Sequence, residues 1–264
     1  MKGILCYHSN SGNTKLTAEY VVHQLRAIKM DCVDIALEPN IEFDAYDVVG
    51  FASWTFFLGL PPFFEQFIAQ IPQQSAKPAF ILNTFGMMPG QSLMLMEKAV
   101  SARGFVIIAG HSFHTPESYP PYIIKEWNSF DAPSSDEFEQ FNQFIAELDT
   151  QLATIDKGTA PAPTKLKIGL FNRLIRPYSL KKIRKQLGNL QIDTNLCTDC
   201  GRCAEVCLYQ AIAMNPSPVV NMDQCAGCWA CFNHCPEKAI FTDRIKDAGH
   251  YAQPITQFAS KMQQ

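Results

Sequence analysis

The sequence predicts an α/β domain with a parallel, doubly wound sheet, followed by a small cysteine-rich domain. Strand-like and helix-like segments alternate through the first 156 residues, which is typical of parallel strands joined by right-handed crossovers. Eight of the ten cysteines then fall between Cys197 and Cys235. The predicted parts are an α/β domain at 1–156, a basic linker with an amphipathic helix at 157–189, a cysteine-rich domain at 190–245 and a tail at 246–264.

Hydrophobic periodicity locates the elements of the first domain. Short apolar runs predict the strands, and apolar residues three or four apart predict the helices between them. The expected strands are 2–8, 32–37, 48–53, 79–83 and 105–109, and the expected helices are 14–29, 62–71, 92–102 and 136–155.

The segment 111–135 is rich in proline and aromatic residues and is long for a loop in a compact domain. Two interpretations are open. The segment builds a substrate pocket, or it is a lid that packs at the domain interface, and we favour the lid. Its candidate side chains are His111, His114, Tyr119, Tyr122 and Trp127.

Charge is unevenly distributed, although the net charge of −3 is too small to suggest a nucleic-acid-binding protein. Residues 1–156 hold 8 basic and 18 acidic side chains, residues 157–192 hold 9 basic and no acidic ones, and residues 193–264 hold 5 basic and 7 acidic ones. A cationic segment therefore separates two acidic blocks. The linker-like sequence TAPAPT, at 159–164, lies near the start of this cationic segment.

Apolar residues in this cationic segment have helical spacing, at Leu180, Ile183, Leu187 and Leu190. The favoured interpretation is that this stripe packs on one domain while the charges face the acidic α/β domain or an acidic partner. We then expect the two domains to dock, with one metal cluster close to the cofactor of the first domain. The alternatives are a swinging, tethered domain and, with less support, contact with an anionic membrane surface.

The N-terminal apolar stretch is too short for a signal peptide, and no run of about 18 apolar residues suggests a transmembrane segment. We therefore expect a cytoplasmic protein, in which clustered cysteines bind metal and do not form disulfides. Cys6 and Cys32 lie in predicted strands and are expected to be small buried hydrophobic residues.

The cysteines form a repeat of 28 residues, in which the run from Cys197 to Cys207 recurs from Cys225 to Cys235. The spacing C-x₂-C-x₂-C-x₃-C is that of bacterial proteins with two iron–sulfur clusters, where the fourth cysteine of each run ligates the other cluster. One cluster is predicted to take Cys197, Cys200, Cys203 and Cys235, and the other Cys225, Cys228, Cys231 and Cys207. Two structural zinc sites are the less favoured alternative, because zinc does not need three cysteines in such close succession.

Residues 190–242 resemble a two-[4Fe–4S] bacterial-type ferredoxin, which implies a small α+β domain. Leu208 departs from the family, which usually has proline there, and this is expected to loosen the backbone after Cys207. Trp229 stands where the first repeat has Gly201, either to shield a cluster from water or to pack.

A polar loop, Ser9 to Thr14, lies between the first predicted strand and helix. A phosphate here would meet free backbone N–H groups at a helix N-terminus as well as hydroxyl groups, and Gly12 allows a tight turn. The alternative is an ordinary capped helix. The motif resembles the FMN-phosphate loop of flavodoxins, a family with a five-stranded sheet of order 2-1-3-4-5.

Two further loops resemble the flavin loops of that family, and Trp54 and Phe56 are the candidates for stacking on the flavin. All three loops follow strands, at the sheet edge where α/β folds bind ligands. The candidate FMN-binding residues are Ser9, Ser11, Gly12, Asn13, Thr14, Ser53, Trp54, Thr55, Phe56, Phe57, Asn83, Thr84, Phe85 and Gly86.

The chain as a whole resembles prokaryotic fusions of a flavodoxin-like domain with a two-cluster ferredoxin. The resemblance implies a protein that passes electrons between two [4Fe–4S] clusters and FMN. The alternative is a reductase whose small substrate, a quinone, nitro compound or activated alkene, reacts at the FMN. Since no G-x-G-x-x-G follows a strand, a redox partner protein is expected in place of NAD(P)H.

Overall fold

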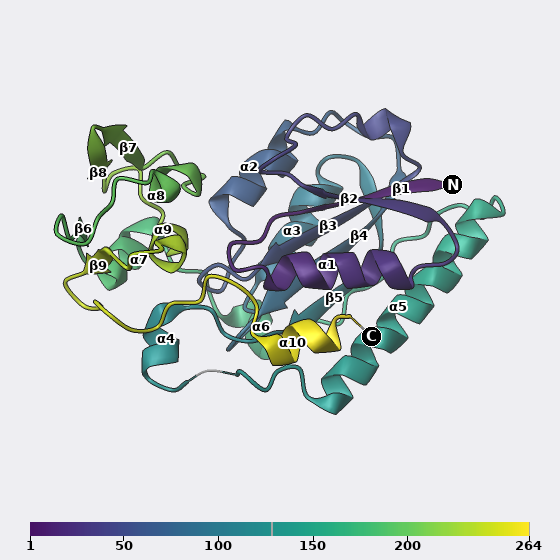
Figure 1. Ribbon diagram of the computed structural model, residues 1–264. Coiled ribbons are helices and arrows are strands. Elements are labelled where there is room, and N and C mark those ends of the chain that lie inside the picture. The colour runs from purple at the N-terminus through teal and green to yellow at the C-terminus, as the bar shows by residue number, and fades with distance from the viewer. Residues whose placement is uncertain (128, 264) are drawn as a thin grey trace.

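The computed structural model describes residues 1–127 and 129–263. Asn128, within the predicted loop 111–135, and Gln264, at the end of the predicted tail, lie outside the described residues. A central sheet with its helices forms one part of the molecule, and the cysteine-rich region lies to its left in Figure 1. The C-terminal segment leaves the cysteine-rich region and returns to the first domain.

The sheet has the order β2-β1-β3-β4-β5, and every neighbouring pair is parallel. Its central strands are buried on both faces, as near-continuous apolar runs dictate in a parallel sheet. This order is the flavodoxin-like one, so the predicted topology is confirmed. The strands are β1 (Lys2–Tyr7), β2 (Lys29–Asp34), β3 (Val48–Trp54), β4 (Lys77–Phe85) and β5 (Phe105–His114).

Helices cover both faces of the sheet, which makes it doubly wound. Helices α1 (Asn13–Gln24) and α5 (Ser135–Asp156) bury Val21, Phe141 and Leu148 against one face. On the other face, α2 (Pro62–Gln70) and α3 (Ser92–Ser101) form a second core. A short 3₁₀ turn (Phe43–Ala45) precedes β3. Cys6 is fully buried in this sheet, and Cys32 is partly buried beside it.

Three elements depart from their predicted bounds by three residues or more, and the others by one or two. Strand β2 lies three residues earlier than 32–37 and α1 ends at Gln24, well before residue 29. Strand β5 continues to His114, because its backbone pairs with β4 as far as Phe85. His111 and His114 therefore lie on a strand and not in a loop. The predicted lid is shorter, and it contains α4 (Pro120–Ile124).

The linker lies along the sheet edge. The Thr164 amide donates to the Ile107 carbonyl at 2.9 Å, and the Leu166 side chain is buried against the position of Gly110. Two helices follow, α6 (Leu170–Leu174) and α7 (Leu180–Leu187). Of the predicted apolar stripe, Ile183, Leu187 and Leu190 are buried as expected, whereas Leu180, the first residue of α7, is 40% exposed.

The cysteine-rich region is a small α+β unit whose two halves repeat in backbone conformation. Strand β6 pairs with β9, and β7 pairs with β8, both antiparallel. Positive φ angles occur at three pairs of positions 28 residues apart, 199 and 227, 201 and 229, and 210 and 238. The elements are β6 (Leu190–Ile192), α8 (Arg202–Glu205), β7 (Ile212–Asn215), β8 (Ser217–Val220), α9 (Ala230–His234) and β9 (Ile240–Thr242).

The turns that follow the fourth cysteine of each run match each other. Gln210 donates to the Cys207 carbonyl at 2.9 Å, and Lys238 donates to the Cys235 carbonyl at 3.2 Å. Leu208 follows Cys207, whereas Pro236 follows Cys235. The same closed turn forms with either residue.

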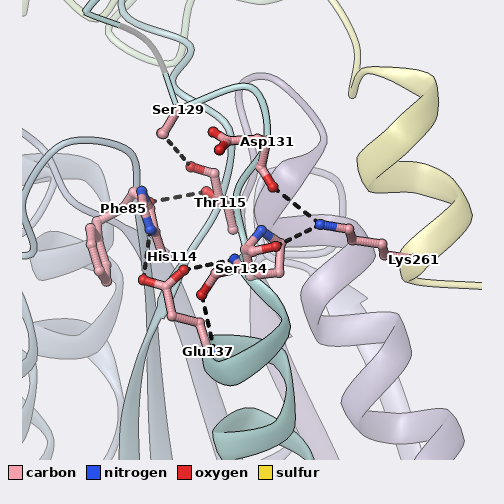
Figure 2. Close-up of polar contacts among 9 residues, drawn as sticks. Phe85, His114, Thr115, Ser129, Asp131, Ser134, Glu137 and Lys261 are labelled. Carbon is pink, nitrogen blue, oxygen red and sulfur yellow. Dashed lines mark hydrogen bonds and ion pairs between the residues drawn. The ribbon is translucent and has the colours of Figure 1, made fainter.

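The tail ends in α10 (Thr256–Lys261), which packs on the same sheet face as α1 and α5 (Figure 1). Phe258 is fully buried there. The Lys261 ammonium donates to the carbonyls of Asp131 and Pro133 at 3.1 and 2.5 Å. Figure 2 shows this ammonium beside Asp131. It also shows His114 beside the Glu137 carboxylate, which caps α5 through the Ser134 amide. The tail is thus an integral part of the first domain's core.

Within the described part of the chain, no helix has the length and apolar character needed to cross a membrane.

Candidate functional site

One large cavity, of about 590 Å³, lies at the carboxyl ends of the sheet strands. It is of the size that small-molecule sites have. Four strand-following loops line it together with α4, α7 and the cysteine-rich region. Its lining from the loops after β1, β3, β4 and β5 includes Asn10, Ser11, Asn13, Thr14, Trp54, Thr55, Phe56, Phe57, Leu58, Thr84, Phe85, Gly86, Met87, Met88, Thr115, Pro116, Glu117, Ser118 and Tyr119.

The loop after β1 offers unpaired donors at one end of the cavity. Helix α1 begins at Asn13, just after Gly12 turns the chain with φ +87°. Among the described residues, the backbone N–H groups from Ser11 to Lys15 have no hydrogen-bond acceptor, and the buried Ser9 hydroxyl has no partner. A cradle of free amides at a helix start suits a phosphate.

The loop after β3 brings aromatic rings to the cavity. The Trp54 ring lies 5.4 Å from the His8 ring, and the Phe56 backbone pairs with Gly59 across a tight turn. Phe57 occupies that turn with a positive φ, and its ring meets the Tyr119 ring edge-on at 5.3 Å. The turn therefore holds two neighbouring aromatic side chains at the cavity in one conformation.

The loops after β4 and β5 meet at a buried carboxyl group, Glu117. Its carboxylate accepts hydrogen bonds from the backbone N–H groups of Ser118, Tyr119 and Met87 at 2.8 to 3.1 Å. Burial raises the pKa of Glu117, although these three amides oppose the shift. Its carboxylate oxygen lies 2.5 Å from where a Cβ on Gly86 would stand, so only glycine fits there. Phe85 stacks face to face on His114, 5.0 Å away, and Figure 2 labels both residues.

Most of the predicted flavin residues line the cavity, and four do not. Ser53 and Asn83 are fully buried at the strand ends, where the Asn83 side chain donates to Thr55 and accepts from Ser112. Ser9 and Gly12 lie in the phosphate-loop candidate but outside the lining. The predicted residues that line the cavity are Ser11, Asn13, Thr14, Trp54, Thr55, Phe56, Phe57, Thr84, Phe85 and Gly86.

Sequence reasoning missed Glu117, Arg244 and the tail. Glu117 follows β5, so the rule that ligands lie at strand carboxyl ends would have found it had the end of β5 been placed correctly. No local pattern marks Arg244, which lines the cavity from beyond β9, or Pro254, whose ring lies 2.6 Å from the position of a Cβ on Gly12. Of the aromatic candidates in the predicted loop 111–135, Tyr119 and Tyr122 line the cavity, whereas Trp127 is exposed.

The His111 side chain does not line the cavity. Its ring packs between Phe141 and Phe144, at centroid distances of 5.5 and 5.0 Å. Burial among these rings lowers its pKa to about 4. Its neutral ring therefore packs on these aromatic side chains.

The eight clustered cysteines gather in two small cavities of about 20 Å³ each. Cys235 joins the three cysteines of the first run, and Cys207 joins the three of the second. Each small cavity is thus lined by three cysteines of one run and the fourth cysteine of the other. No three described His, Cys, Asp or Glu side chains are grouped closely enough for one metal ion. In a [4Fe–4S] cluster each thiolate binds a different iron, so the four cysteines lie farther apart than the ligands of a single metal ion.

The two cysteine groups differ in burial. Cys200 in the first group is exposed, whereas all four cysteines of the second group are partly buried. Desolvation raises the pKa of Cys228 to about 12. Backbone amides approach the sulfurs in both, with Ala211 donating to Cys207 Sγ at 3.2 Å and Ala239 to Cys235 Sγ at 3.3 Å. All-thiol donor sets with N–H···S bonds suit iron–sulfur clusters.

The second cysteine group adjoins the large cavity. Gly227, Cys228 and Trp229 line both spaces. Trp229 is only 4% exposed, holds a φ of +63° and packs on Tyr119 and Phe232, and its buried indole N–H has no partner. A left-handed conformation costs a bulky residue about 1–2 kcal/mol, so burial of the ring must offset that cost.

Apolar packing and hydrogen bonds dock the two domains. Phe56 of the first domain packs with Ile183 of α7 and Ala226 of the cysteine-rich region. His234 Nε2 donates to the Asn10 carbonyl at 2.6 Å, and Arg184 donates to the Cys225 carbonyl at 2.7 Å. No basic residue of 157–192 forms an ion pair with any described residue of the acidic domain, so direct charge pairing, one of the interactions expected from the sequence, plays no part in this docking.

Known proteins match both parts of the chain. Residues 189–212 and 218–241 each match a family model described as a 4Fe-4S binding domain. Similar solved structures, all with a TM-score of 0.42, include a flavodoxin from the domain Archaea (16% identity, 58% of this chain and 99% of that one), the Streptococcus pneumonia TIGR4 flavodoxin (14%, 57% and 99%) and flavodoxin 2 from Bacillus cereus (17%, 59% and 99%). The assignment of the first fold rests on the sheet order. The chain thus joins an α/β domain with the flavodoxin-like sheet order to a region with two matches to 4Fe-4S binding domains.

Proposed function

We infer that the protein transfers electrons between two [4Fe–4S] clusters and an FMN. The observation that carries this inference is that Cys228 and Trp229 line the same cavity as the three flavodoxin-like loops. Iron–sulfur clusters exchange single electrons, whereas a flavin takes up one or two, so the pair suits a protein that converts between the two modes. The proposed parts of the chain are the α/β domain at 1–156, the linker at 157–189, the cysteine-rich domain at 190–245 and the tail at 246–264.

The crossed cysteine sets are the proposed cluster ligands. Cys197, Cys200, Cys203 and Cys235 would hold the outer cluster, and Cys225, Cys228, Cys231 and Cys207 the inner one. The exposure of Cys200 favours the outer set as the point of contact with a redox partner protein. The position of Cys228 in the lining of the large cavity favours the inner set as the neighbour of the flavin.

The loop after β1 favours FMN over a dinucleotide. Its free amides from Ser11 to Lys15 and the unpaired Ser9 hydroxyl provide donors for one terminal phosphate. Pro254 lies against Gly12 of this loop. The ring would lie toward Trp54, Phe56 and Phe57, the aromatic side chains of the second loop.

Several residues of this chain would shape electron transfer. Trp229 excludes water between the inner cysteines and the cavity, and its unpaired indole N–H is a donor available to a bound group. Glu117, whose pKa burial raises, places a carboxyl group at the cavity wall beside Gly86 and Met87. Tyr119 packs on both Trp229 and Phe57, so it joins the inner cysteine group to the flavin loop.

The test is rapid reduction of the clusters in the holoprotein, with the flavin followed optically at several protein and salt concentrations. Docked domains predict flavin reduction at a rate that does not depend on protein concentration. Only modest salt sensitivity is expected, because the interface consists of apolar packing and hydrogen bonds. A rate that rises in proportion to protein concentration would mean transfer between molecules and would overturn the proposal.

A reductase is the second candidate, favoured by one feature of the cavity. Beyond the flavin loops it is lined by three charged side chains, Glu117, Lys125 and Arg244, which a docking face for electron transfer alone does not need. Anaerobic turnover of quinones, nitro compounds and activated alkenes would be compared with that of free FMN. Turnover well above that of free FMN supports the reductase, and cluster and flavin reduction without turnover supports the carrier.

A further inference from the structure

The amphipathic character of the cationic segment is divided between its two helices. On α7 the apolar side chains Ile183 and Leu187 are buried against the cysteine-rich region. On α6, by contrast, Leu170, Phe171 and Leu174 are 73%, 64% and 72% exposed. Three large apolar side chains within five residues form an uncovered apolar patch, which differs from the scattered single residues that are normal on protein surfaces.

Contacts of the residues before and after α6 hold this patch in place. Before α6, Leu166 is buried in the core next to β5. After α6, the Tyr178 amide donates to the Phe57 carbonyl at 3.1 Å. The Arg173 carbonyl of α6 itself accepts from the Gln91 side chain at 2.7 Å. The apolar residues are therefore held outward by an anchored segment and are not part of a free end.

Positive charge surrounds the patch. The segment 157–192 has 9 basic residues and no acidic one. Among the described residues none of these 9 forms an ion pair. Arg184 is bonded to the cysteine-rich region and Lys182 lies over the Tyr178 ring, whereas the exposed cations next to them are Lys165, Lys167, Arg173, Arg176, Lys181 and Lys185.

We propose that this segment docks the protein on an anionic lipid surface, with the side chains of α6 entering the interface and the lysines meeting the headgroups. Exposed leucine and phenylalanine beside unpaired lysine and arginine is the composition of interfacial helices. A protein partner fits less well, because lysine is depleted in protein–protein interfaces. Six of the nine cations are lysines.

The test is sedimentation of the holoprotein with vesicles of phosphatidylcholine alone or mixed with phosphatidylglycerol. Binding is expected only to the mixed vesicles, and it should weaken as salt is added. Each removed charge should weaken binding about fivefold, the effect of one cation near an anionic leaflet. The double variant Lys167→Gln/Lys181→Gln should therefore bind about 25-fold more weakly.

Matched variants separate this surface from general effects. Phe171→Gln/Leu174→Gln should abolish binding to the mixed vesicles, whereas Leu37→Gln/Val219→Gln, at comparably exposed positions elsewhere, should not. Lys29→Gln/Lys98→Gln serves as the charge control. Absence of binding to the mixed vesicles, equal binding to neutral ones, or binding that survives the α6 variant would each overturn the proposal. Cofactor content and internal electron transfer should stay unchanged, so this result is independent of the proposed function.

Discussion

The hydroxyl of Tyr251 donates a hydrogen bond to Asn13 Oδ1 at 3.0 Å, although the two residues are 238 positions apart. Asn13 is the first residue of α1, and its side-chain amide nitrogen, Nδ2, donates to the Pro116 carbonyl at 2.9 Å. The Tyr251 amide donates to Asn233 Oδ1 on α9 at 3.1 Å. Burial raises the pKa of the Tyr251 hydroxyl, which stays protonated and able to donate. One tail residue thus connects the phosphate-loop candidate to the cysteine-rich region.

Tyr251→Phe should therefore weaken flavin binding. The change removes the hydroxyl that orients Asn13 and that accepts the Ile255 amide, and it should cost about 1 kcal/mol of unfolding free energy. Tyr20→Phe is the matched control, since the Tyr20 hydroxyl donates to Asn142 away from the loop. Flavin titration of both apoproteins checks the prediction. Equal flavin affinity in the two variants would contradict it.

Gly12→Val should empty the flavin site while leaving the clusters in place. A Cβ at residue 12 would stand 2.6 Å from Pro254, and the φ of +87° disfavours any β-branched residue. Gly158→Val is the control, because Gly158 has a φ of +95° with nothing within 4 Å. Flavin released from the unmodified protein should be FMN. Release of FAD, or retained flavin in Gly12→Val, would contradict the assignment of this loop.

Cys235→Ser should damage the cluster held by the first cysteine run. The structure places Cys235 with Cys197, Cys200 and Cys203, so the second group stays complete. Anaerobically reconstituted protein should hold about eight iron per chain and the variant about four. Cys207→Ser is the reciprocal variant, and electron paramagnetic resonance of each should show the opposite cluster. Zinc at about two per chain would contradict the cluster assignment.

Trp229→Gly should slow internal electron transfer. Glycine accepts the φ of +63° without strain and stands at the equivalent position 201 of the first repeat, but it removes the ring between the inner cysteines and the cavity. Loss of a buried tryptophan costs about 3–5 kcal/mol, partly offset by the relieved strain of about 1–2 kcal/mol. Trp229→Phe, which keeps a ring in place, should have a smaller effect on the transfer rate. A transfer rate in Trp229→Gly equal to that of the unmodified protein would show that the ring only packs.

Acid should destabilise the protein through His111. Burial lowers its pKa to about 4 in the folded protein, so between pH 4 and its ordinary value of 6.5 the unfolded chain binds more protons. Unfolding free energy should then rise with pH across this window, by up to about 3 kcal/mol. His111→Phe should flatten that part of the profile in denaturant titrations, whereas His23→Phe, at an exposed position, should not. An unchanged slope in His111→Phe would contradict the prediction.

Local sequence patterns were sufficient to predict those parts of the protein whose structure depends on residues close together in the chain. Apolar runs such as 48–53 define buried strands, and the 28-residue cysteine repeat defines both the second domain and its crossed groups. The loop from Ser9 to Thr14 could be recognised because a helix start after a strand exposes backbone amides wherever it occurs. The end of β5 was missed for the opposite reason, since pairing with β4 extends it through His111 and His114, residues without a strand pattern.

The sequence by itself determined the two domains, the order of their elements and the residue types that can bind a flavin and iron–sulfur clusters. Only the tertiary structure decided that the second cysteine group adjoins the cavity and that Tyr251 and Pro254 contact the first loop. It also decided that the apolar side chains of α6 stay exposed while Ile183 and Leu187 of α7 are buried. The physical reason is that periodicity reports which face of a segment is apolar. What covers that face depends on contacts between residues far apart in the chain.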